Sequence, residues 1–121
     1  MSYDDNNIFA KILRDEIPCK KIYEDDYVLS FYDIKPQKKV YVLVIPKGKY
    51  IDLDDFNSKA SDKEIVGLIK GISIVAKKLG ISVDIGKGYR ALTNLSEHGG
   101  QEVPHLHFHL FGGEIVGKMV E

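Results

Sequence analysis

Within residues 105–111, near the C-terminus, polar and apolar residues alternate strictly as far as Leu110. A period of two residues is typical of a β-strand, so this segment is predicted to be a strand. Its polar positions are all histidines and would share one face of a sheet, while the apolar residues between them would share the other. The histidines are His105, His107 and His109, and the apolar residues are Leu106, Phe108 and Leu110. A strand that only packs in a core needs no histidine, so the row indicates a functional site.

Four further runs rich in apolar and β-branched residues predict strands. Residues 20–24 and 27–32 flank an aspartate-rich turn and would form a hairpin. Residues 40–45 would form the next strand. In this run Tyr41, Leu43 and Ile45 would point to one side, and Val42 and Val44 to the other. Residues 89–94 would lead through a loop that contains His98 into the histidine strand.

The longest helix is predicted after Ser61. Ser61 and Glu64 form a capping-box sequence, in which each side chain can accept a backbone N–H at the start of a helix. Apolar residues then recur at helical spacing, and they are Ile65, Leu68, Ile69, Ile72, Val75, Ala76 and Leu79. Gly80 supplies the stop. Gly67 and Gly71 lower the helix propensity, which indicates close packing against another element, in the same chain or in a second subunit.

Two shorter helical segments complete the pattern. Asn7 can cap a helix from Ile8 to about Asp15, which would end before Pro18. A loop with one helical turn is expected over residues 52–56.

The elements together predict an α+β fold in a single domain over residues 1–121. It would contain an antiparallel sheet of about five strands, one long helix and a short N-terminal helix. Hydrophobic residues make up 44% of the chain and charged residues 29%, the balance of a globular protein in water. The formal net charge of −1 provides no electrostatic footprint for nucleic acid or for an acidic membrane.

The chain carries no sign of export or membrane insertion. No stretch approaches the roughly 18 consecutive apolar residues of a membrane span, and the N-terminus lacks the apolar core of a signal peptide. The one cysteine, Cys19, cannot form an internal disulfide, which agrees with a reducing cytosol. We therefore expect a cytoplasmic protein with no nucleic-acid partner and no membrane partner.

Three roles are open to the histidine row. Same-face neighbours on a strand lie roughly 6.7 Å apart, so one pair could share a metal ion but all three could not. The row could instead supply donors for an anion such as phosphate, with one histidine as a base or nucleophile. The third alternative is a half-exposed strand in which the histidines have no chemical role. The Gly99-Gly100 pair before the row favours an anion, because such turns bring backbone N–H groups close to a ligand.

The chain resembles the histidine-triad (HIT) superfamily and, within it, the Hint branch. The family motif His-apolar-His-apolar-His-apolar-apolar fits residues 105–111 at every position. The resemblance continues in order along nearly the whole chain, through residues 7–12, 16–18, 23–26, 31–37, 43–47 and 112–113. It implies a HIT-like fold and a two-fold homodimer formed through the long helix and an adjoining strand.

The resemblance also implies a mechanism. Family members hydrolyse or transfer nucleotides at a phosphorus attached to a nucleoside, through a covalent nucleotidyl-histidine. His107 would be the nucleophile, His109 would donate to a non-bridging phosphoryl oxygen, and His105 would support the orientation of the site. Imidazole is a good neutral nucleophile near pH 7, and a covalent intermediate divides one difficult step into two. This mechanism needs no metal ion or other cofactor.

Further positions match residues that bind substrate in the family. Phe31, Asp33 and Ile34 match the segment that holds the nucleoside, and a carboxylate can accept from both ribose hydroxyls. Asp33 by itself also fits a simple turn. Leu43 would line the base pocket. The phosphate side would be formed by Asn94, Gly100, Gln101, Glu102 and Val103. Because like charges repel, Glu102 would offer its backbone N–H or meet a cationic leaving group.

Two departures from the family pattern matter. Tyr41 stands where many members have a further histidine, and its phenol can still donate a hydrogen bond to the active histidines. Some bacterial relatives hold a structural zinc through two cysteines and a histidine. Those positions are Asn7, Ala10 and Tyr50 in this chain, so that zinc is not expected.

The functional expectation is a hydrolase that binds purine nucleotides. It would cleave purine nucleoside phosphoramidates, or similar nucleotidyl conjugates, to a nucleoside monophosphate such as AMP. Two alternatives remain: a hydrolase of dinucleoside polyphosphates, and a nucleotide-binding regulatory protein whose catalysis is vestigial.

Overall fold

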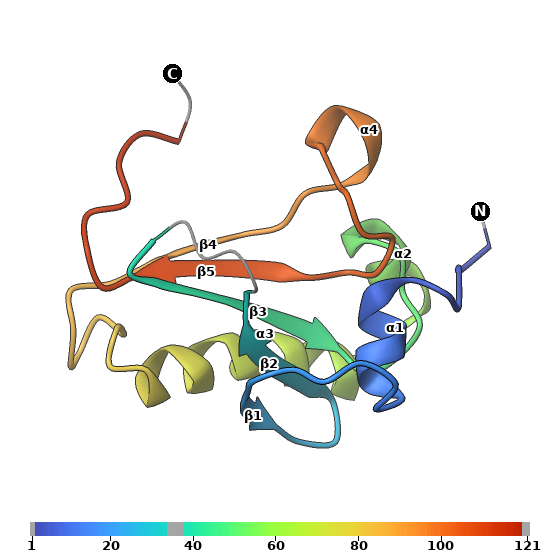
Figure 1. The fold of residues 1–121 in the computed structure, drawn as a ribbon, viewed down its shortest axis with the longest axis horizontal. Coiled ribbons are helices and arrows are strands. Elements are labelled where there is room, and N and C mark those ends of the chain that lie inside the picture. The colour runs from blue at the N-terminus through green and yellow to red at the C-terminus, as the bar shows by residue number, and fades with distance from the viewer. Residues whose placement is uncertain (1, 34–37, 120–121) are drawn as a thin grey trace.

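The described part of the chain, residues 2–33 and 38–119 of a computed structural model, contains one five-stranded antiparallel sheet and four helices (Figure 1). The elements are α1 (Ile8–Leu13), β1 (Lys21–Glu24), β2 (Val28–Tyr32), β3 (Val40–Pro46), α2 (Leu53–Lys59), α3 (Asp62–Lys78), β4 (Arg90–Leu92), α4 (Ser96–Gly99) and β5 (Phe108–Gly112). The strand order β1-β2-β3-β5-β4 places β3 in the centre and β5 beside it. The α+β fold with a five-stranded antiparallel sheet is therefore confirmed.

The two faces of the sheet bury two separate groups of apolar side chains. On the face covered by α3, β3 contributes Val42 and Val44, and the histidine segment contributes Leu106 and Leu110. On the opposite face, β3 contributes Tyr41, Leu43 and Ile45, which pack with Phe9 and Ile12 of α1 and with Leu29 and Phe31 of β2. The predicted division of the β3 residues between two faces is thus confirmed. Figure 1 shows α3 running along one face, with α1 beside the start of β5.

Helix α3 forms as its sequence predicts. Ser61 accepts from the Glu64 N–H and Glu64 accepts from the Ser61 N–H, which completes the capping box. A Cβ added to Gly67 would lie 2.8 Å from the Tyr27 side chain, and one added to Gly71 would lie 3.0 Å from Val28. The two glycines therefore let α3 approach the start of β2, and the close packing lies within this chain.

The apolar stripe of α3 is narrower than its spacing predicts. Leu68, Ile72 and Val75 are buried, but Ile69 is 55% exposed. Ile69 fits the helical spacing, but it turns toward the outer face of the helix together with Val66.

The histidine strand is shorter than predicted. Strand β5 begins at Phe108, which pairs with Val44, and residues 105–107 precede it without ladder pairing. Ahead of β5, the Leu106 N–H donates to the Tyr50 carbonyl, which lies outside β3. The Pro46 carbonyl accepts from the His105 ring. The alternation of faces nevertheless persists, since Leu106 is fully buried on the α3 side.

Smaller differences concern the other boundaries. Helix α1 ends at Leu13 rather than near Asp15, strand β4 covers only Arg90–Leu92, and α2 is longer than one turn. The loop expected around His98 contains the short helix α4, and His98 is exposed there. No helix within the described residues is both long and apolar enough to cross a lipid bilayer.

Candidate functional site

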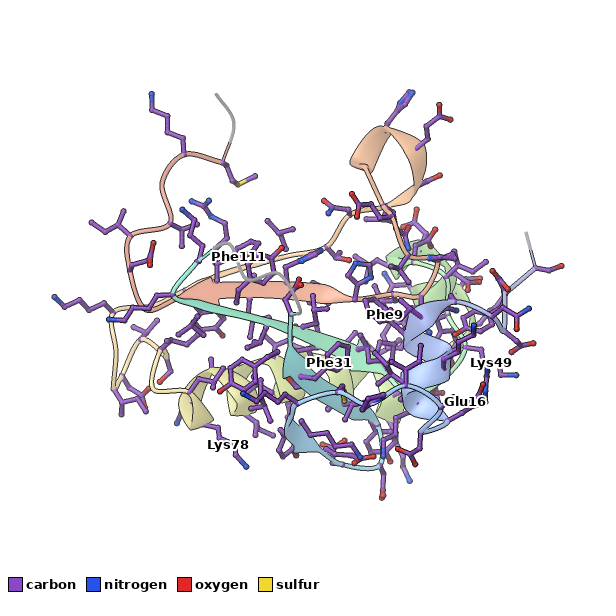
Figure 2. All side chains as sticks on the ribbon, in the orientation of Figure 1. Phe9, Glu16, Phe31, Lys49, Lys78 and Phe111 are labelled. Atoms are coloured by element: carbon purple, nitrogen blue, oxygen red, sulfur yellow. The ribbon has the colours of Figure 1, made fainter. Side chains whose placement is uncertain are left out.

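A cavity of about 980 Å³ opens on the sheet face that carries α1. Its wall combines residues of α1 and of strands β2, β3 and β5 with the loop that precedes β5. Phe9 and Phe31, labelled in Figure 2, lie between α1 and β2 with ring centroids 5.7 Å apart. His107 and His109 line the same cavity, and their ring centroids are 4.9 Å apart.

His105 lies beneath the cavity rather than in its wall, and its side chain is fully buried. Its Nε2 lies 2.9 Å from the Pro46 carbonyl oxygen, and its Nδ1 lies 2.5 Å from the Tyr3 hydroxyl. A carbonyl can only accept, so Nε2 carries the proton and Nδ1 accepts from the phenol. Burial lowers the pKa of His105 to about 4, which keeps the ring neutral at pH 7.

His107 has its proton fixed by the backbone. Its Nδ1 donates to the carbonyl oxygen of His105 at 2.7 Å, so Nε2 is left with a free lone pair. Burial lowers the pKa of His107, against an opposing influence from the His105 carbonyl and from the carboxylates of Asp33 and Glu102. The edge of the Phe9 ring packs against the imidazole at a centroid distance of 4.9 Å, which restrains its orientation.

His109 differs from its neighbours because one of its nitrogens is unsatisfied. Its Nδ1 lies 3.1 Å from the Tyr41 hydroxyl. Its Nε2 is buried and, among the described residues, is the one buried side-chain nitrogen or oxygen atom that has no hydrogen-bond partner. The pKa of His109 is lowered to about 4, mainly by burial and to a smaller extent by the neighbouring His107. An unpaired buried polar atom is costly unless a ligand satisfies it.

The rest of the cavity has an apolar end and a polar end. At the apolar end, Ile12, Phe31 and Leu43 are buried, and Asp33 follows directly after β2. At the polar end, Gly100 adopts a left-handed conformation with φ of 75°, as the expected turn requires. In such a cavity the apolar slot can hold a planar ring, the carboxylate can accept from hydroxyl groups, and the histidines can bind an anion.

Seven of the predicted binding residues line this cavity with His107 and His109. They are Phe31, Asp33, Leu43, Asn94, Gly100, Glu102 and Val103. Gln101 does not line it. Its amide nitrogen donates to the carbonyls of Ile51 and Val103, and its oxygen accepts from the Ser96 N–H. These hydrogen bonds hold the loop before β5 in place. The prediction for Ile34 lies outside the described residues.

Sequence reasoning assigned no binding role to a second set of lining residues. These are Ile8, Phe9, Ile12, Pro18, Cys19, Lys20 and Tyr32. The apolar face of the N-terminal helix could have indicated some of these residues, since a short amphipathic helix packs its apolar face against another apolar surface. Tyr41 also lines the cavity, although the sequence singled it out only as a departure from the family.

The charges around the cavity are few. Asp33, Glu102 and Lys20 are the charged residues within its described lining. Across residues 2–33 and 38–119, no group of three or more histidine, cysteine, aspartate or glutamate side chains could hold a metal ion.

The fold and the site define an α+β protein with a row of histidines at a cavity on one sheet face, two of them in its wall and one beneath it. The sequence profile of the HIT domain family matches residues 14–115, and the chain belongs to this family. It is 50% identical over 119 residues to a 13.2 kDa HIT-like protein of Azospirillum brasilense, an alignment that covers 98% of this chain and 95% of the relative.

Two further relatives cover nearly the whole chain. The purine nucleoside phosphoramidase of Escherichia coli K12 is 38% identical over 116 residues, which are 96% of this chain and 94% of that enzyme. The solved structure of a HIT family hydrolase from Clostridium thermocellum superposes with a TM-score of 0.85 and is 36% identical. The superposition covers 98% of this chain and 99% of that one, which confirms the HIT-like fold.

Proposed function

We propose that this protein hydrolyses purine nucleoside phosphoramidates, or similar nucleotidyl conjugates, to the nucleoside monophosphate, with His107 as the nucleophile. The observation that carries the proposal is the hydrogen bond from His107 Nδ1 to the His105 carbonyl, because it leaves Nε2 unprotonated at the cavity. The similarity to the E. coli purine nucleoside phosphoramidase supports the substrate class.

The reaction would proceed in two displacements at phosphorus. In the first, the lone pair of His107 Nε2 forms a bond to phosphorus while the P–N bond of the phosphoramidate breaks. The amine leaves with that electron pair and takes a proton from solvent. In the second, water attacks phosphorus, the bond to Nε2 breaks, and the nucleoside monophosphate departs after the water loses a proton. A covalent intermediate of this kind replaces one difficult step by two easier ones.

The neighbouring histidines would divide the supporting roles. His109 offers a buried, unpartnered Nε2 within the same cavity, which suits a donor to a non-bridging phosphoryl oxygen. His105 would orient the site, since its backbone carbonyl receives the His107 proton while its ring is held on both sides. No metal ion is part of this scheme.

The remaining lining residues would hold the nucleotide. The apolar end, with Phe31 and Leu43, suits a purine base, and Asp33 suits the ribose hydroxyls. Ile34 is proposed to belong to the same nucleoside segment. Asn94, Gly100, Glu102 and Val103 would lie on the phosphate and leaving-group side, with Gln101 holding their loop in place.

The decisive experiment compares wild type with His107→Ala during turnover of an adenosine phosphoramidate in the presence of a chelator. The wild-type protein should release AMP and, when quenched, carry an AMP-sized adduct that maps to His107 by mass spectrometry. His107→Ala should lose at least about a thousandfold in kcat, while AMP binding stays within roughly tenfold.

The control variant is His98→Ala, which removes an exposed histidine outside the cavity and should turn over normally. Equal turnover by His107→Ala and wild type would overturn the mechanism. Faster hydrolysis of a diadenosine polyphosphate than of the phosphoramidate would overturn the substrate class. AMP binding without turnover of either compound would favour a regulatory protein.

We also propose that the chain forms a homodimer through the outer face of α3. Val66, Ile69 and Ile74 on this helix are between 42% and 55% exposed, although they are large and apolar. Exposed apolar side chains gathered on one helix are a feature of surfaces that bind another protein.

A further inference from the structure

Tyr41 contacts the histidine row from the neighbouring strand. Its phenol oxygen lies 3.1 Å from His109 Nδ1, and the two rings meet edge to face at a centroid distance of 5.9 Å. The strand register makes them a diagonal pair on one face, since Leu43 is opposite His109 and Tyr41 is opposite Phe111. Tyr41 is only 8% exposed.

Phe111 holds both rings in this arrangement. Its ring lies edge-on to Tyr41 at 4.4 Å and stacks on His109 at 6.0 Å with an interplanar angle of 18°. The hydrogen bond is therefore formed by two side chains whose rotation is restricted by packing, rather than by a flexible pair.

The direction of this hydrogen bond follows from the protonation of both partners. Burial keeps the pKa of His109 near 4, so at pH 7 the ring is neutral and carries one proton. Burial, with Asp33 and Glu102 nearby, raises the pKa of Tyr41, so the phenol keeps its proton. Within residues 2–33 and 38–119, His109 is the hydrogen-bond partner found for this phenol. Donation from the phenol to Nδ1 uses its proton and satisfies both groups.

We propose that Tyr41 is a positioning residue that holds His109 in the tautomer with its proton on Nε2, so that this N–H is presented to the cavity. The inference rests on the proposed function, in which His109 donates to the substrate's phosphoryl oxygen. It explains why Nε2 is buried without a partner: the donor is kept ready for an acceptor that the substrate brings.

The opposite tautomer would defeat this role. With its proton on Nδ1, His109 would present a lone pair to a negatively charged phosphoryl oxygen, and the two would repel. A neutral imidazole can adopt either tautomer, so the partner of Nδ1 decides which one is populated. The phenol makes this choice without adding a charge to the site.

Tyr41→Phe tests the inference, because it removes one oxygen and leaves the ring that packs on Phe111. Two-bond proton–nitrogen correlation spectra of the ¹⁵N-labelled protein report the tautomer of each histidine without substrate. In wild type, His109 should be protonated on Nε2, and His107, protonated on Nδ1, serves as the internal reference. In Tyr41→Phe, a measurable Nδ1–H population should appear at His109. Its kcat for an adenosine phosphoramidate should fall about tenfold, the factor that one ordinary hydrogen bond supplies, with KM within about twofold.

Tyr23→Phe is the matched control. It removes the phenol oxygen of a β1 residue, which donates to Asp25 at 2.7 Å. Strand β1 is at the opposite edge of the sheet from β4, so this variant should change neither the His109 tautomer nor kcat. The inference is overturned if wild-type His109 is protonated on Nδ1, or if Tyr41→Phe leaves the tautomer or kcat unchanged. If the wild-type protein turns over no phosphoramidate, the proposed function fails, and the His109 tautomer alone then decides the inference.

Discussion

The proton of each histidine in the row is assigned by a different neighbour. A proline carbonyl fixes His105, a backbone carbonyl fixes His107, and a phenol fixes His109. Burial lowers the pKa of all three rings, so the row is neutral at pH 7 and its hydrogen bonds decide which nitrogen is free. An imidazole attacks phosphorus only through an unprotonated nitrogen, and the proposed chemistry therefore depends on these few contacts.

The burial of His105 should make the fold sensitive to acid. Its pKa is about 4 in the fold and has its ordinary value of 6.5 in the unfolded chain. Between these values the unfolded chain binds a proton that the folded chain does not. Stability is therefore full above about pH 6.5 and is lost as the pH falls toward 4. At pH 5 this ring should lower the free energy of unfolding by about 2 kcal/mol, measured by urea denaturation at pH 7 and pH 5.

A pair of variants isolates this contribution. His105→Gln should show a smaller loss between pH 7 and pH 5 than wild type, whatever its stability at pH 7. His98→Gln, at an exposed position, should show the wild-type loss. The assignment is wrong if the pH dependence of His105→Gln equals that of wild type.

Among the elements, α3 shows how a local preference yields to packing. Gly67→Ala should gain about 1 kcal/mol of helix propensity. The new Cβ would lie 2.8 Å from the base of the Tyr27 side chain, however, and overpacking of this kind costs about 1–3 kcal/mol. We expect a net loss of about 1 kcal/mol in the free energy of unfolding, measured by urea denaturation at pH 7.

Ser73→Ala provides the comparison for α3. It makes a smaller gain in helix propensity at an exposed position of the same helix, so it should stabilise the protein slightly. If Gly67→Ala is stabilised as much as Ser73→Ala, Gly67 is not a close-packing position.

The sequence predicted well those helix and strand boundaries that depend only on residues close together in the chain. Ser61 and Glu64 lie within one turn of each other, so their pattern locates the start of α3 directly. The start of β5 could not be predicted in this way, because the residues before it bond to Pro46 and Tyr50, which are distant in sequence. Ile69 fits the helical period but faces outward, and periodicity alone does not fix the width of the buried stripe.

At the scale of the whole molecule, the site joins segments that are distant in sequence. The histidine row is visible in the sequence because its residues are neighbours. The contribution of α1 is not visible there, since Phe9 meets His107 only after the chain has folded. The same is true of Tyr3, which reaches His105 across 102 positions. Residue patterns therefore indicate the chemistry, and the fold determines which other side chains surround it.

The proposed homodimer gives a prediction at the same scale. Ile69→Glu puts a charge on the outer face of α3, where the native side chain is 55% exposed, so the folded chain can tolerate it. Burying an unpaired carboxylate between two subunits is costly, and the variant should elute as a monomer in size-exclusion chromatography with light scattering, while wild type elutes as a dimer. Ile85→Glu, at an apolar position 61% exposed outside α3, should remain dimeric. A monomeric wild type, or a dimeric Ile69→Glu, would show that this face is not the interface.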